Sequence, residues 1–111
     1  MKTLSISNTS EISVKFTLKE GAANKLFAFT FTAVRLDQDE ISERMDDKNK
    51  KVKDFMADVI TGWSGQRLVL EDNGEPAAFS AEALAMMLNV MGVAGILFAA
   101  YLKDCGAKEK N

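Results

Sequence analysis

Histidine is absent from this chain of 111 residues, and cysteine and proline occur once each. Histidine is the commonest general base in enzymes, a frequent zinc ligand and the usual activator of a nucleophile. A single cysteine, Cys105, cannot form an internal disulfide, so no oxidising compartment is indicated. No apolar run of signal-peptide length follows the first methionine. We therefore expect a cytoplasmic protein that is not an enzyme, without catalytic, metal-binding or cofactor-binding residues.

Charge is missing from one long segment, although it is ordinary in the chain as a whole. The net charge is −2 and 27% of the residues are charged, values that are typical of a globular protein. Residues 83–102 contain no charged side chain, where that fraction would place about five. What this apolar segment contacts is therefore the main question about function.

Three polar clusters match known kinds of site only in part. Gly62-Trp63-Ser64-Gly65 departs from a nucleophile elbow because glutamine follows it, so we interpret it as a turn. The acidic run from Asp37 departs from a calcium-binding loop at the fifth, sixth and twelfth positions. A basic cluster is flanked by aspartates and has no interleaved aromatic residue, so we expect a solvated helix start and no nucleic-acid binding. Its members are Lys48, Lys50, Lys51 and Lys53.

Two stretches of alternating apolar and polar residues predict strands. The first runs from Ile12 to Leu18, and the second runs from Phe27 to about Arg35. The connection between them contains Gly21 and Asn24, which both tolerate positive φ. Residues 1–36 are thus predicted to form an antiparallel β-hairpin, which must pack on other elements because a lone hairpin is marginally stable.

Residues 37–65 are rich in charge and are predicted to be helical. Ile41 and Met45 lie four residues apart, as in a short helix. An apolar stripe then predicts a better helix at about residues 48–61. The stripe consists of Val52, Phe55, Met56, Val59 and Trp63. We expect Trp63 in the core where this helix ends, with contact to a partner as the alternative.

Residues 66–79 combine a short apolar run with a strong turn signal. Residues 67–70 are interpreted either as a third strand against the hairpin or as an extended connector. The sequence Asp72-Asn73-Gly74-Glu75-Pro76 follows and predicts a turn. Its proline makes the next residues a poor partner strand.

Residues 80–105 form the apolar helical segment, and residues 106–111 form a tail. Ser80 stands in the position of an N-cap and Gly106 in that of a C-cap, for a helix at about residues 81–104. Gly92 and Gly95 each cost about 1 kcal/mol relative to alanine in a helix. We therefore expect a kink, or a break into two helices, near these glycines.

Together these elements predict a single α+β domain that spans residues 1–111. An N-terminal antiparallel β-hairpin, three-stranded if residues 67–70 join it, packs on helices at about 48–61 and 81–104.

The apolar segment has three interpretations. Its twenty residues are long enough to cross a bilayer, but its alanines and glycines contribute little to insertion. A helix buried on all sides would need more cover than this short chain easily provides. We favour a buried helix that also takes part in self-association or partner binding, and we expect no membrane contact. The candidate partner-binding residues are Trp63, Leu84, Met86, Met87, Val90 and Met91, because flexible methionines suit apolar partners of varied shape.

Residues 54–102 contain an ordered series of short motifs. The series begins with Asp54-Phe55 and continues with Val59-Ile60-Thr61-Gly62-Trp63-Ser64-Gly65, Asp72-Asn73-Gly74-Glu75-Pro76, Phe79-Ser80, Leu84, Leu88 and Ala99-Ala100-Tyr101. In this order the motifs resemble the tail assembly chaperones of lambda-like long-tailed bacteriophages and prophages. The pair Gly92 and Gly95 departs from that pattern.

The resemblance implies a specific function. Such chaperones act in the host cytoplasm, bind the long apolar helices of the tape measure protein and keep that protein soluble. They help to recruit tail tube subunits, through a longer form made by a −1 ribosomal frameshift, and are absent from the mature virion. They tend to form homo-oligomers. The alternatives are a structural phage tail or head–tail component and a small tail-anchored membrane protein.

Overall fold

The chain begins with a long antiparallel hairpin of two strands, β1 (Thr9–Glu20) and β2 (Ala23–Val34). The computed structural model describes residues 2–46 and 51–107. Glu20 pairs with Ala23, so only two residues form the turn, and Gly21 takes a φ of 61°. Glycine at the first position of a two-residue turn is typical of a hairpin. The hairpin prediction is confirmed, but Asn24 lies inside β2 and not in the turn.

The two faces of the hairpin differ sharply. Cross-strand pairs such as Ile12 with Phe31 and Val14 with Phe29 are buried and form one side of the core. On the opposite face Ser13 pairs with Thr30, and their hydroxyl groups lie 3.2 Å apart. The alternation in the sequence therefore produces one apolar and one polar face.

A third strand, β3 (Ile60–Ser64), pairs antiparallel with β2, giving the sheet order β1-β2-β3. The prediction that a helix extends to residue 61 and carries Trp63 at its exit is therefore wrong. Helix α2 (Val52–Val59) ends where the backbone of Ile60 becomes extended, and Trp63 pairs with Phe31. Ile60 and Thr61 are β-branched and favour a strand, and β2 supplies the hydrogen-bonding edge. Residues 48–50 of the predicted helix lie outside the described residues.

Of the two interpretations of residues 67–70, the extended connector is confirmed and the third strand is wrong. Leu70 makes only an isolated bridge with Pro76, across a turn in which Gly74 has a φ of 85°. The buried Gln66 side chain holds this loop: its amide N–H donates to the carbonyls of Val69 and Ala77, at 2.9 and 3.0 Å. Gln66 Oε1 also accepts from the backbone N–H of Val69.

Three further helices complete the fold. Helix α1 (Gln38–Met45) begins at a capping box formed by Asp37 and Glu40. Helix α3 (Ala81–Leu88) begins at Ser80, whose hydroxyl accepts from the N–H of Ala83, as predicted. Helix α4 (Val93–Cys105) ends at Gly106. The α3 and α4 axes are bent by 103° at the break, where Gly92 has a φ of 87°, so the predicted break is confirmed.

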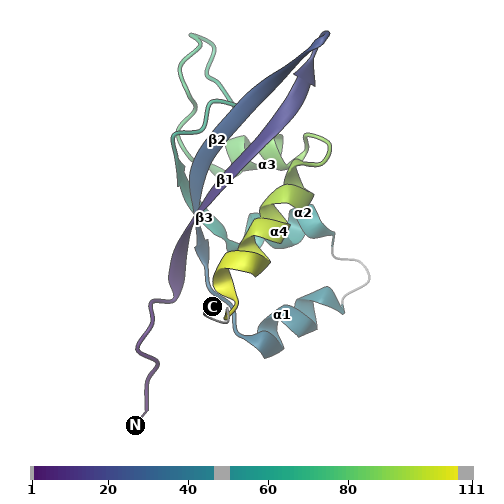
Figure 1. Cartoon of the computed structure of the whole chain (residues 1–111). Coiled ribbons are helices and arrows are strands. Elements are labelled where there is room, and N and C mark those ends of the chain that lie inside the picture. The colour runs from purple at the N-terminus through teal and green to yellow at the C-terminus, as the bar shows by residue number, and fades with distance from the viewer. Residues whose placement is uncertain (1, 47–50, 108–111) are drawn as a thin grey trace, which may run out of the picture.

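The helices pack on the apolar face of the sheet and on one another. Helix α4 packs against β1, and α2 packs on both α3 and α4 (Figure 1). The buried apolar residues form one cluster, which includes Phe31, Met56 and Tyr101. The α+β fold class is confirmed: a three-stranded antiparallel sheet packs against four helices.

Candidate functional site

The candidate partner-binding residues separate into a buried and an accessible group. Leu84 and Met87 are 3% and 0% exposed, because they lie on the side of α3 that faces the core. Met86 is 58% exposed and Met91 is 94% exposed, while Val90 is half-buried. Of these candidates in the apolar segment, therefore, Met86, Met91 and part of Val90 are accessible to a partner.

Trp63 is fixed by contacts within the chain. Its indole N–H donates to the carbonyl of Ala77 at 3.1 Å, and its ring meets that of Phe79 edge to face, with 5.2 Å between centroids. Phe79 directly precedes the N-cap of α3. The half-buried Trp63 side chain thus joins β3 to the start of α3, and its role is to position that helix.

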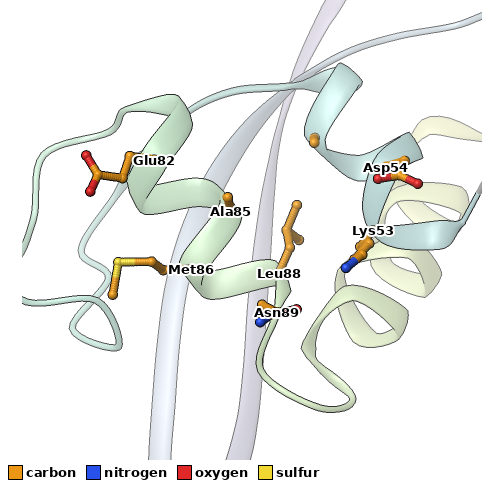
Figure 2. Close-up of a pocket in the computed structure, with 8 residues that line it drawn as sticks. Lys53, Asp54, Glu82, Ala85, Met86, Leu88 and Asn89 are labelled. Atoms are coloured by element: carbon orange, nitrogen blue, oxygen red, sulfur yellow. The ribbon is translucent and has the colours of Figure 1, made fainter.

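A groove lies between α2 and α3. We call it the α2–α3 groove; its volume is about 510 Å³. It is lined by Lys53, Asp54, Ala57, Glu82, Ala85, Met86, Leu88 and Asn89. Figure 2 shows Leu88 directed into the space between the two helices and Met86 on the side of α3 that is turned away from α2. Among these lining residues, the sequence analysis named only Met86 as a candidate for partner binding.

The lining of the α2–α3 groove is apolar in the middle and charged at its border. Ala57 and Ala85 are exposed and small, and the nearly buried Leu88 forms the floor. Lys53, Asp54 and Glu82 carry the charges, near the first turns of α2 and α3. Small side chains let another backbone approach closely. The groove therefore suits an amphipathic helix whose apolar stripe is flanked by polar residues.

A second cavity of about 550 Å³ lies where the N-terminal segment, α1 and the end of α4 meet. Its lining includes Leu4, Ile6 and Leu102, which are 82%, 57% and 41% exposed. The alternation of Thr3-Leu4-Ser5-Ile6-Ser7 resembles a strand, yet residues 3–7 are not in one. This short alternating pattern is the sequence signal by which Leu4 and Ile6, the apolar residues that the N-terminal segment adds to the cavity, could have been found.

Hydrogen bonds join the end of α4 to the end of β2 beside this cavity. The Tyr101 hydroxyl donates to the carbonyl of Val34 at 2.8 Å and accepts from the N–H of Leu36 at 3.2 Å. The Arg35 guanidinium donates to the carbonyl of Cys105 at 2.6 Å. Burial raises the pKa of the Tyr101 hydroxyl and that of the Cys105 thiol above their ordinary values. Both groups are therefore protonated near neutral pH.

The described part of the chain was searched for metal-binding clusters and for helices that could cross a membrane. Residues 2–46 and 51–107 contain no group of three or more Cys, Asp or Glu side chains that could hold a metal ion. Within the same ranges no single helix has the length and apolarity to cross a membrane. Helices α3 and α4 pass that test only as a bent pair, by length and composition.

Comparisons of the chain with protein-family models, with curated proteins and with solved structures found no match. What the protein does is therefore inferred from its own residues and surfaces.

Proposed function

We propose that this chain is a tail assembly chaperone of a long-tailed bacteriophage or prophage, which binds apolar helical segments of the tape measure protein. The observation that carries the proposal is the α2–α3 groove, with its apolar centre and charged border. A long apolar helical protein aggregates unless its apolar stripe is covered during assembly. A groove between two helices covers such a stripe by adding a third helix to the pair.

The motifs that resemble those of tail assembly chaperones also favour the α2–α3 groove as the binding surface. Trp63 contacts Phe79, Phe79 precedes the cap residue Ser80, and Ser80 starts α3. Asp54 belongs to α2 and borders the groove. The motif residues therefore set the positions of the two helices that form the α2–α3 groove, although most of them do not line it.

The proposal includes the rest of the assembly cycle. The chaperone acts in the host cytoplasm, forms homo-oligomers and leaves before the virion is complete. A longer form, made by ribosomal frameshifting, carries the contact with tail tube subunits. Neither nucleic acid nor a membrane takes part, and the chain performs no catalysis.

The test is binding of the purified chain to overlapping helical peptides from the tape measure protein encoded in the same phage genome. Ala85→Glu places a carboxylate in the apolar centre of the groove, and we expect it to weaken binding at least tenfold, or about 1.4 kcal/mol. The matched control is Ala28→Glu, because Ala28 is also exposed but lies on the sheet. Calorimetry measures the affinities, and circular dichroism checks that both variants fold.

Two results would contradict the proposal. In the first, no peptide binds the unmodified chain; in the second, Ala85→Glu and Ala28→Glu bind equally well. Mass spectrometry of purified virions provides a separate check. A structural tail component would be found there in fixed proportion to the tail tube, whereas a chaperone would be missing.

A further inference from the structure

Part of the hairpin has a strand edge on which backbone groups lack a partner. In an antiparallel ladder, each residue directs its N–H and C=O to the same side, and successive residues alternate between the two sides. The residues that flank the two-residue turn form a bonded pair, so every second residue of β2 from Ala23 bonds β1. The residues between them face the other side, where β3 pairs only with residues 30–33. Asn24, Leu26 and Ala28 therefore direct their N–H and C=O groups to an edge that no strand occupies.

This stretch, residues 24–28, is accessible, and we call it the open β2 edge. Asn24 and Ala28 are exposed, and Leu26 is 55% exposed. Within the described residues, the outward backbone groups of these three residues form no hydrogen bond. Figure 1 shows the hairpin tip projecting away from the loop that follows β3. The open β2 edge is therefore free to pair with another strand.

A hollow lies where β3 ends and the open β2 edge begins. Pairing with β2 stops at Ser64, and the next residue, Gly65, has a φ of 77° and lies outside the strand. The hollow has a volume of about 560 Å³, and Ala28 and Lys15 line it together with these two residues. It leaves room for side chains of a strand placed in line with β3.

The two edges of the hairpin differ in their protection. On β1 the outward residues from 11 to 19 include three charged side chains among five, those of Glu11, Lys15 and Lys19. Charged side chains, and lysine above all, commonly protect an exposed edge from pairing with another chain. The outward residues of the open β2 edge carry no charge. Pairing is therefore opposed at β1 and permitted at β2.

The hairpin tip is positively charged, although the whole chain has a net charge of −2. Residues 13–19 and 24–30 contain three lysines and no acidic side chain. Lys25 has an exposed ion pair of 3.7 Å across the turn. Lys15 and Lys19 lie on the polar face of the hairpin and form no salt bridge within the described residues. This charge favours an acidic partner.

We propose that the open β2 edge binds an extended acidic peptide segment of a partner protein, which adds a strand antiparallel to β2 and in line with β3. The backbone of the segment completes the hydrogen bonding of the edge. Lys15 lies opposite Ala28 and Lys19 lies opposite Asn24. Because Ala28 and Asn24 are short, both lysines reach across β2 to acidic side chains on the added strand.

The register defines the order of residues in the segment. An added strand that runs antiparallel to β2 has its first residue opposite Ala28 and its fifth opposite Asn24. These two residues are acidic. The third is apolar because it lies beside the exposed Leu26, and the second is apolar because it lies beside the half-buried Phe27. A second copy of this chain does not fit, since pairing of two β2 edges brings lysines of like charge together.

This inference goes beyond the proposed function and does not rest on it. The open β2 edge shares no residue with the α2–α3 groove. One copy can therefore bind a helix in the groove and an extended segment at the hairpin, and changes at the two surfaces have separate effects.

A synthetic peptide with the sequence Thr-Glu-Val-Val-Thr-Glu-Thr tests strand addition to the full chain, with fluorescence anisotropy as the measurement. Its second valine lies opposite Leu26 and directs its N–H to β2, so N-methylation there should weaken binding at least tenfold. The first valine directs its N–H to solvent, so N-methylation there is the matched control and should leave binding unchanged. Replacing both glutamates with lysine should also weaken binding at least tenfold.

A pair of protein variants separates this surface from the groove. Ala28→Glu places a carboxylate between Lys15 and the first glutamate of the peptide, and it should weaken binding at least tenfold. Ala85→Glu adds the same charge on α3 and should leave binding unchanged. For helical peptides in the α2–α3 groove the expected order is the reverse, so failure of one proposal is distinguishable from failure of the other.

Hydrogen exchange followed by NMR identifies the edge. The acidic peptide should protect the amides of Asn24, Leu26 and Ala28 and leave those of Lys15 and Lys19, which face outward from β1, unchanged. The proposal is overturned if the peptide does not bind at about 1 mM, if the two N-methylated peptides bind equally, or if the β1 amides are protected instead. An acidic oligonucleotide that protects the same three amides as strongly as the peptide would also overturn it, because binding would then follow charge alone.

Discussion

Tyr101 joins two distant parts of the chain through one hydroxyl group. The side chain is fully buried, and its hydroxyl both donates to Val34 and accepts from Leu36, at the point where β2 ends. From the sequence pattern alone, Tyr101 is predicted only to occupy an apolar position in a helix. Its partners lie 65 to 67 residues earlier in the chain, so the hydrogen bonds follow from the packing of α4 and not from any local pattern.

Replacing Tyr101 with phenylalanine is expected to destabilise the fold by about 1–3 kcal/mol, because the part-buried carbonyl of Val34 and the part-buried N–H of Leu36 both lose their partner. Burial raises the pKa of Tyr101, so the unfolded chain loses this proton at a lower pH than the folded chain does. The free energy of unfolding should therefore fall as pH rises above about 10, and the raised pKa of Cys105 adds to the fall from about pH 8.5.

Urea unfolding at pH 7 and at several values up to pH 11 measures both effects. The pH-dependent loss should be smaller in Tyr101→Phe and smaller still when Cys105→Ser is added. An identical pH slope in all three chains would contradict the assignment of the loss to these two groups.

The division of the apolar segment into α3 and α4 was expected from its glycines, but the division of its residues into core and surface was not. A stretch that is apolar on all sides gives no periodic signal from which a buried face could be chosen. Because the chain bends by 103° at the break that contains Gly92, Leu84 and Met87 face the core while Met91 is 94% exposed. Likewise β3 could not be found from residues 60–64 alone, because its formation depends on pairing with β2.

Gly92 and Gly95 are expected to respond oppositely to the same substitution. Gly92 has a φ of 87°, so Gly92→Ala forces an L-residue into the left-handed region and should destabilise the fold by about 1–2 kcal/mol. Gly95 is helical with open space around it, so Gly95→Ala should stabilise the monomer by up to about 1 kcal/mol. Thermal unfolding at low concentration compares the two variants. If both substitutions stabilised the fold, or both destabilised it, the backbone at the break would differ from this description.

At the scale of the whole molecule, the chain exposes more surface than a compact monomer of the same mass does. The accessible surface is 8019 Å², against about 6,100 Å² for a compact monomer of this mass. The radius of gyration is 15.3 Å, against about 13 Å for a compact chain of this length. Figure 1 shows the hairpin tip and the N-terminal segment projecting from the body formed by the helices. The excess surface is therefore distributed between projecting segments and exposed helix faces.

Hydrogen exchange distinguishes these sources of exposed surface in a single experiment. Paired amides near the hairpin tip, between Thr17 and Leu26, should exchange by local fraying, since β3 pairs only with residues 30–33 of β2. The amides of Ile12 and Phe31, which are fully buried, should exchange only by global unfolding. A bound partner helix should then add protection in α2 and α3. Protection that appeared first at the hairpin tip would mean that the hairpin, and not these two helices, is the contact surface.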